Sequence, residues 1–79
     1  MNYLKERAGQ AKQKGKNCTI WLEWRDGEPA SWLIETPTNE KRSKRFSDLM
    51  NWSQKHQIRI EYTTLRPDIG ELDRRINAR

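Results

Sequence analysis

The sequence predicts an α+β fold in which two helices cover one face of a small three-stranded antiparallel sheet. Residues 18–35 contain two stretches in which apolar and polar residues alternate, and this period of two is typical of strands. Residues 57–64 alternate in the same way. Residues 46–56 and 68–78 instead repeat apolar residues at the spacing of an amphipathic helix. The expected order along the chain is therefore β-β-α-β-α, after a frayed basic N-terminal segment.

The N-terminal segment, residues 1–16, is basic and carries only a thin apolar stripe. Helix-forming residues dominate it, but Gly9 and Gly15 interrupt them. We therefore expect a short frayed helix at residues 2–8 and then a partly flexible basic lead. The single α+β domain is expected to comprise residues 17–79.

The central hairpin contains three of the four tryptophans of the chain. Its strands are expected at residues 18–25 and 30–35, and the sequence Asp-Gly-Glu-Pro at residues 26–29 marks the turn. Alternate residues of the two strands are apolar and face the same side. The predicted core face consists of Ile20, Leu22, Trp24, Trp32 and Ile34.

The register of this hairpin follows from burial of one face. A two-residue turn would place Leu22 opposite Ser31, which mixes apolar with polar side chains on both faces. A shift by one residue places Leu22 opposite Trp32 and Ile20 opposite Ile34. We therefore predict a turn with an odd number of residues, between three and five.

The second half of the chain supplies the helices and the third strand. Ser43 or Ser47 is expected to cap the first helix, and Asp68 with Glu71 resembles a capping box at the start of the second. In the strand between them, one face is expected to bury three residues: Ile58, Ile60 and Tyr62.

Length and composition indicate one small domain in a reducing compartment. A chain of 79 residues lies near the lower size at which a domain folds without added cross-links. The single cysteine, Cys18, cannot form an internal disulfide and is expected to be buried in its strand. No apolar run has the form of a signal peptide or the length of a membrane span, so a cytoplasmic protein without membrane contact is expected.

Charge is distributed unevenly along the chain, which has a formal net charge of +5. Residues 1–16 hold five basic residues and one acidic residue, and residues 40–45 hold four and one. Residues 17–39, which include the hairpin, hold one basic and four acidic residues. An acidic hairpin thus lies between two basic segments, and basic segments attract polyanions.

The sequence gives little support for catalysis. Its one histidine, His56, and its one cysteine belong to no recognisable nucleophile–base pattern. The four glycines are scattered rather than gathered in a phosphate-binding loop, and paired metal-ligand spacing is absent. We therefore expect a protein that is not an enzyme and that needs neither a cofactor nor a metal.

The favoured interpretation is a small module that binds nucleic-acid backbone through its two basic segments. Lysine and arginine neutralise phosphates whatever the base sequence, so such binding weakens steeply with salt. The candidate contact residues are Lys12, Lys14, Lys16, Lys41, Arg42, Lys44 and Arg45.

A second interpretation is an inhibitor or adaptor that binds an acidic or nucleic-acid-handling protein. Trp21 and Leu33 are expected side by side on the outer face of the hairpin, and Arg25 and Arg59 are expected close to them. In size and in its sheet-plus-helix plan the chain resembles anti-CRISPR inhibitors of phages and mobile elements, and no motif is carried over from them. A homodimer through the same outer face is a third use of this pair.

Overall fold

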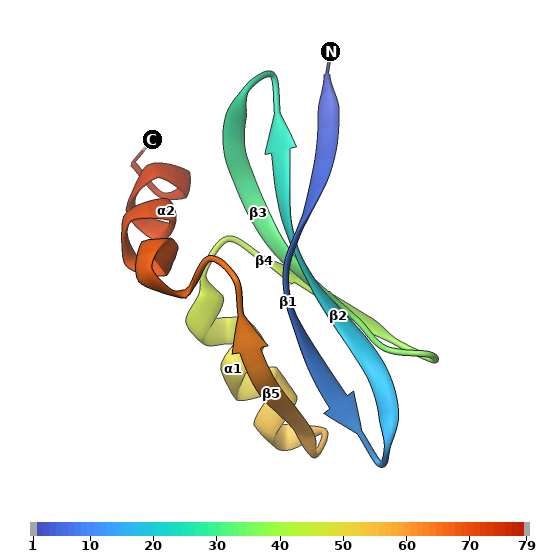
Figure 1. Cartoon of the computed structure of the whole chain (residues 1–79). Helices are drawn as coiled ribbons and strands as arrows, with labels where there is room; N and C mark the ends of the chain where they lie inside the picture. Colours follow the sequence, from blue (N-terminus) through green and yellow to red (C-terminus); the bar gives the residue numbers. More distant parts are fainter. Residues whose placement is uncertain (1, 79) are drawn as a thin grey trace.

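The computed structural model describes residues 2–78, so Met1 and Arg79, the outer ends of the two predicted segments, lie outside it. Residues 2–78 form five strands, two α-helices and one short 3₁₀ helix (Figure 1). In order, these are β1 (Tyr3–Gln13), β2 (Lys16–Arg25), β3 (Glu28–Glu35), β4 (Glu40–Ser43), α1 (Phe46–Lys55), β5 (Ile58–Thr63), η1 (Arg66–Asp68) and α2 (Ile69–Ile76).

The strands form one antiparallel sheet in the order β4-β3-β2-β1-β5. The prediction of a three-stranded sheet is therefore wrong, although the α+β class, the central hairpin, both helices and the third predicted strand are confirmed. The two missed strands are β1, which replaces the expected frayed helix at residues 2–8, and β4, which lies in the expected loop after the hairpin.

β1 is a strand because of its neighbours rather than its composition. Its Ala, Lys, Glu and Gln residues favour helix in isolation, but β2 pairs along its whole length and β5 pairs along its second half. Ala8, Gly9 and Ala11 are buried between these neighbours, and residues this small give almost no apolar pattern. A bulge at Ala8 also breaks the alternation, so the period of two is hidden in the sequence.

β4 is a short edge strand made entirely of polar residues, Glu40–Ser43. Edge strands in natural sheets are commonly short and charged, because both features discourage pairing with another chain. The basic residues at positions 41 and 42 thus obscure a strand that hydrophobic patterning cannot detect.

The hairpin register is confirmed in its apolar centre, where Leu22 pairs with Trp32 and Ile20 with Ile34. The predicted odd-length turn is wrong. The turn has two residues, Asp26 and Gly27, with φ of +52° and +80°, and Arg25 pairs with Glu28. A bulge near Trp24 absorbs the extra residue, so the strands keep a tight turn and still bury one face.

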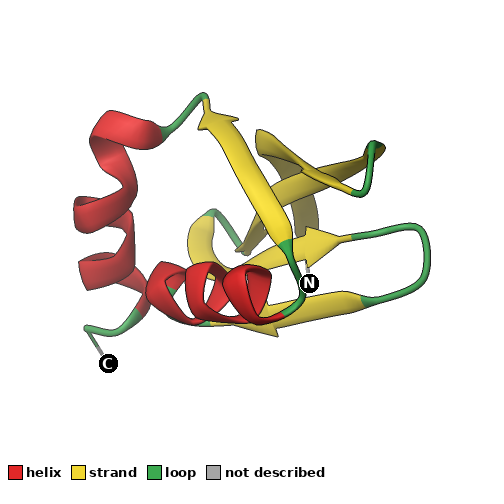
Figure 2. Cartoon of the chain, turned by 90° about the horizontal axis from the view of Figure 1, so that it is seen from below, coloured by secondary structure: helices red, strands yellow, loops and turns green. Residues whose placement is uncertain are grey.

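Both helices cover the same face of the sheet, as Figure 2 shows from below. Phe46 and Leu49 of α1 and Leu72 and Ile76 of α2 join the buried side chains of β1, β2, β3 and β5 in one core. Trp32 is fully buried at its centre, whereas Trp24, which was expected in the core, is only partly buried at its margin. Within residues 2–78, no helix is long and apolar enough to cross a bilayer.

Contacts from elsewhere in the chain hold the helix starts in place of the predicted caps. No side chain caps α1 locally; instead the Phe46 N–H donates to the Asp73 carboxylate of α2 at 3.2 Å. The Trp32 Nε1–H donates to the same carboxylate at 2.6 Å. The expected capping box at Asp68 does not form, since no side-chain cap is present at α2. One acid therefore ties both helices to β3.

β5 departs from its expected alternation at its second half. Gln10 pairs with Tyr62 and Ala11 pairs with Ile60, so Glu61 is an extra residue in the ladder. This bulge turns Tyr62 to the side of the sheet away from the helices, where it is 49% exposed, instead of into the core.

Gly9→Ala is expected to destabilise the protein by about 1–3 kcal/mol, because overpacking moves backbone or forces strain. A Cβ at Gly9 would lie 2.5 Å from the Tyr62 carbonyl oxygen and 2.7 Å from the Thr63 Cα, both in β5. The matched control is Gly70→Ala in α2, where a Cβ meets nothing within 4 Å and alanine is the better helix former by about 0.5–1 kcal/mol. Urea unfolding of both variants checks this, and equal effects would contradict the packing seen at Gly9.

Candidate nucleic-acid interface

The face of the sheet away from the helices is mainly polar and carries most of the candidate residues. Odd-numbered residues of β2 point to this outer face, since the even-numbered Cys18, Ile20 and Leu22 lie in the core. Pairing across the strands then places Arg7 beside Trp21, and Lys12 beside Arg59. The same pairing places Arg42 beside Leu33. We refer to this side as the outer face.

A buried carboxylate lies in the outer face near the hairpin turn. Glu23 is only 2% exposed. Arg42 binds it with two hydrogen bonds, from Nε to Oε1 at 2.7 Å and from Nη2 to Oε2 at 3.1 Å. The Ser31 hydroxyl donates to Oε1 at 2.7 Å, and the Tyr3 hydroxyl donates to Oε2. Four strands thus contribute to one satisfied ionic cluster.

This cluster fixes the charge states of its members. Burial alone would raise the pKa of the Glu23 carboxyl, but the hydrogen bonds from Arg42, Tyr3 and Ser31 outweigh burial and lower that pKa from 4.5 to about 2. The hydrogen bond to Glu23 in turn raises the pKa of the Tyr3 hydroxyl and that of the Arg42 guanidinium. Arg42, a candidate phosphate ligand, therefore already binds a carboxylate of its own chain.

The outer-face pair Trp21 and Leu33 is covered by other side chains of the protein. Leu33 is 2% exposed. The Lys5 ammonium lies 4.4 Å from the centroid of the Trp21 ring and 3.5 Å from Glu35, whose carboxylate accepts the Trp21 Nε1–H at 2.6 Å. The two residues are neighbours, as expected, but they do not form an open apolar patch.

The first basic segment is divided between the two faces: Lys12 lies on the outer face, Lys14 in the adjoining turn and Lys16 on the side of the helices. Lys12 is exposed on β1, Lys14 lies in the β1–β2 turn with φ of +51°, and Lys16 begins β2. Arg59 of β5 pairs with Lys12 and is 82% exposed, with Glu61 at 3.8 Å. Within residues 2–78, the three lysines have no acidic partner within ion-pair distance.

The second basic segment does not join the first. Lys41 pairs with Ile34 on the side of the helices, and Arg42 binds Glu23 on the outer face. Arg45 precedes α1, and the Lys44 carbonyl accepts a hydrogen bond from the Asn77 side chain at 2.8 Å. In Figure 1 the β1–β2 turn lies at the lower end, well away from the junction of β4 and α1. The two segments thus present separate surfaces.

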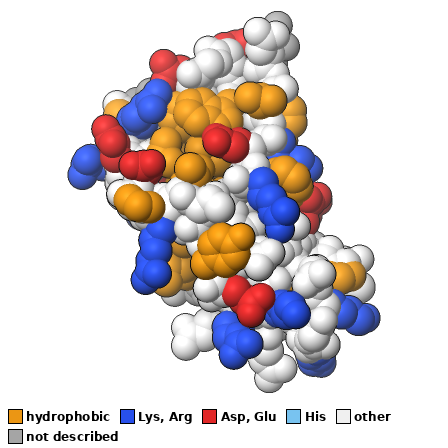
Figure 3. All heavy atoms as spheres, in the orientation of Figure 1, with side chains coloured by type: hydrophobic (Ala, Val, Ile, Leu, Met, Phe, Trp, Pro, Cys, Tyr) orange, Lys and Arg blue, Asp and Glu red, His pale blue; other side chains and the backbone are white. Residues whose placement is uncertain are grey.

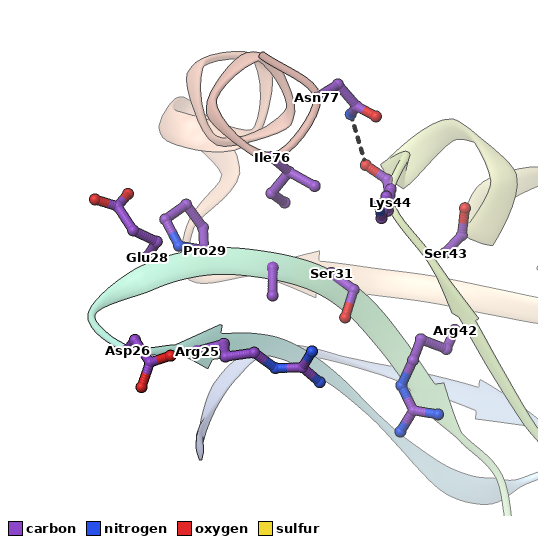
Figure 4. Close-up of a pocket in the computed structure, with 11 residues that line it drawn as sticks. Arg25, Asp26, Glu28, Pro29, Ser31, Arg42, Ser43, Lys44, Ile76 and Asn77 are labelled. Carbon is purple, nitrogen blue, oxygen red and sulfur yellow. Dashed lines mark hydrogen bonds between the residues drawn. The ribbon is translucent and has the colours of Figure 1, made fainter. Parts of the chain in front are cut away.

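A groove of about 600 Å³ runs between the start of β3 and the end of α2 (Figure 4). Arg25, Arg42 and Lys44 contribute cations to it, while Asp26 and Glu28 contribute acids. Glu28 also pairs with Arg75 of α2 at 3.2 Å. Because the lining charges have both signs, the groove has no clear preference for an anion or a cation.

A comparison of the chain with protein-family models, curated proteins and solved structures finds no match. In the part of the chain that the structure describes, no group of three His, Cys, Asp or Glu side chains is placed to hold a metal ion. Cys18 is buried, which raises the pKa of its thiol, and His56 packs against the Trp52 ring at 4.4 Å between centroids.

Sequence reasoning missed three features of the outer face. The exposed cation Arg7 and the partly exposed Lys5 belong to the unrecognised strand β1, and Tyr62 is exposed only because of the bulge in β5. The sequence offered one indication of this strand. Tyr3, Lys5 and Arg7 are separated by single residues, as on one face of a strand, but this pattern covers only five residues.

Proposed function

We propose that this protein is a non-enzymatic module that binds single-stranded nucleic acid through a basic stripe on its outer face. The stripe follows β1, the β1–β2 turn and the start of β5. It consists of Arg7, Lys12, Lys14 and Arg59.

The observation that supports this proposal is the spacing of exposed cations along one strand and its turn. At about 3.3 Å per residue, the distance from Arg7 to Lys14 along β1 is roughly 23 Å. One strand of DNA carries a phosphate about every 3.4 Å of helix axis, so each cation can meet a different phosphate. Of the four, only Arg59 has an acidic neighbour within ion-pair distance among residues 2–78.

An exposed aromatic ring favours a single strand over a duplex. Tyr62 pairs with Gln10, which lies on β1 between Arg7 and Lys12, and the Arg7 Nη2–H donates to the Gln10 side chain at 3.0 Å. Tyr62 is therefore placed among the cations. Unpaired bases stack on such rings, and each stacked base contributes about 1–3 kcal/mol.

The acids on the outer face do not oppose this proposal as strongly as their number suggests. Glu23 is buried and bound by Arg42, and Glu35 accepts hydrogen-bonding and ionic contacts from Trp21 and Lys5. A cytoplasmic location is part of the same proposal, and the single buried thiol, Cys18, supports it.

Fluorescence anisotropy with a labelled 20-nucleotide oligothymidylate tests the proposal. If about four phosphates are contacted, a rise from 50 to 200 mM salt weakens binding roughly 50-fold. Lys12→Glu with Lys14→Glu is expected to weaken it at least tenfold. The matched control, Lys44→Glu with Arg45→Glu, changes the net charge equally on the other surface and is expected to change affinity less than threefold.

Tyr62→Ala adds a test of base stacking. Loss of one stacked base is expected to weaken oligothymidylate binding roughly 5- to 150-fold and to leave binding of a 20-base-pair duplex unchanged. Equal losses with the two double charge variants would refute the assignment of the stripe. No binding of the oligonucleotide at 50 mM salt would refute the proposed function itself.

A further inference from the structure

β1 has two neighbouring strands along only half of its length. β2 pairs with Tyr3–Gln13, whereas β5 pairs only with Gly9–Gln13. Residues 3–7 thus have no strand on their second side among residues 2–78. Figure 1 shows this upper half of β1 standing clear of β5 and α2. We call residues 3–7 the free edge.

The backbone of the free edge has hydrogen-bonding groups directed away from the sheet. The Asp26 N–H donates to the Asn2 carbonyl at 2.7 Å, and hydrogen-bonded pairs alternate along an antiparallel ladder. Leu4 and Glu6 therefore direct their backbone groups toward β2, and Tyr3 and Lys5 direct theirs outward. The free edge ends at Ala8, whose carbonyl accepts the Thr64 N–H at 2.6 Å.

The side chains along the free edge have different chemistry on its two sides. On the side of the helices, Leu4 pairs with Trp24 and is 63% exposed. On the outer face lie Tyr3, Lys5 and Arg7, of which Arg7 has no acidic partner within residues 2–78. Figure 3 shows hydrophobic side chains gathered in the upper half of the molecule, where β1 begins. On the side of the helices an added strand would therefore meet Leu4 and Glu6, whose carboxylate already accepts the Trp24 Nε1–H at 3.0 Å, and on the other side it would meet positive charge.

We propose that the free edge binds an extended segment of a partner protein in which acidic and apolar side chains alternate. Residues that lie directly opposite each other in a sheet share a face. Acidic side chains of the added strand then meet Lys5 and Arg7, while apolar ones cover Leu4. The outward backbone groups of Tyr3 and Lys5 supply the hydrogen bonds that such strand addition requires.

A second copy of this chain fits the free edge poorly. In antiparallel pairings of two copies that keep the faces matched, Lys5 lies opposite Tyr3, Lys5 or Arg7 of the other copy, and two of these three registers bring like charges together. Like charges directly opposite each other are destabilising. The register with Lys5 opposite Tyr3 avoids this repulsion but offers Lys5 no acidic side chain, so an acidic partner is favoured over a second copy.

The test uses a blocked heptapeptide of alternating glutamate and valine, with a lysine–valine peptide as control. Titration followed by amide hydrogen exchange is expected to show binding of the acidic peptide and at least fivefold slower exchange at Tyr3 and Lys5. Lys5→Pro, which removes one outward N–H, is expected to weaken binding at least fivefold relative to Lys5→Ala, which removes only the side chain.

The exchange measurement on the wild-type protein decides the outcome if Lys5→Pro does not fold. The proposal would be overturned if the peptide slowed amide exchange only in β4 or β5, or if the two peptides bound equally well. It would also be overturned if self-association without peptide protected the Tyr3 and Lys5 amides. The peptide experiment involves no nucleic acid, so its failure is distinguishable from failure of the basic stripe.

Discussion

Trp32→Ala is expected to lower the free energy of unfolding by about 3–5 kcal/mol, the range for deletion of a fully buried large aromatic side chain. Trp32 is 0% exposed and meets the Phe46 ring edge-on, with 5.0 Å between centroids. Its loss would leave a cavity and would also remove one of the donors to Asp73. A domain of this size has only about 5–10 kcal/mol of stability in total, so the variant is expected to lose roughly a third of it or more.

Trp52→Ala provides the matched control, because the same atoms are removed from a partly buried site on α1. Urea unfolding followed by circular dichroism is expected to show a loss for Trp52→Ala of less than half that for Trp32→Ala. Similar losses for the two variants would mean that β3 and the helices are not joined at Trp32 as the structure shows.

Protonation of Glu23 at low pH is expected to lower the free energy of unfolding by about 3 kcal/mol. Its pKa of about 2 in the folded protein lies below the ordinary value of 4.5, so the unfolded chain binds more protons between these values. The contribution is complete above about pH 5 and is lost as the pH falls toward 2, at about 1.4 kcal/mol for each pKa unit of difference.

At pH 7, Glu23→Gln is expected to lower the free energy of unfolding by a similar amount. The difference in this free energy between the variant and the wild-type protein is expected to vanish as the pH approaches 2. Glu40→Gln is the control, since Glu40 lies 3.8 Å from the same Arg42 but is exposed, and exposed pairs contribute less than about 1 kcal/mol. Urea unfolding at pH 2, 4 and 7 measures both variants. A gap that is constant with pH would contradict the ionised cluster.

Hydrophobic patterning predicted those elements that bury a continuous face. The hairpin, α1 and α2 have large apolar residues at a regular period, and each was placed to within two or three residues. β1 could not be found in this way, because its buried residues are Ala8, Gly9 and Ala11 and its alternation is broken by a bulge. β4 has no buried residue, since it only closes the sheet edge.

The candidate interface was predictable only where sequence neighbours stay neighbours in space. One tight hairpin turn joins the ends of β1 and β2, so Lys12, Lys14 and Lys16 lie close together in the structure. Arg42 was taken for a free cation because its partner, Glu23, lies 19 residues away in a strand that is two places along the sheet. Pairing across a sheet decides which charges remain free, and a single sequence does not show that pairing when two strands are missed.

The position of β1 between β2 and β5 has a consequence for the order of folding. Gln13 pairs with Lys16 across a tight turn, but it also pairs with Ile58, which lies 45 residues later in the chain. Closing the longer loop costs more chain entropy, and contacts distant in sequence slow folding. The four-strand meander of β1 to β4 can therefore assemble from local contacts, and β5 is expected to pair with the second half of β1 only afterwards.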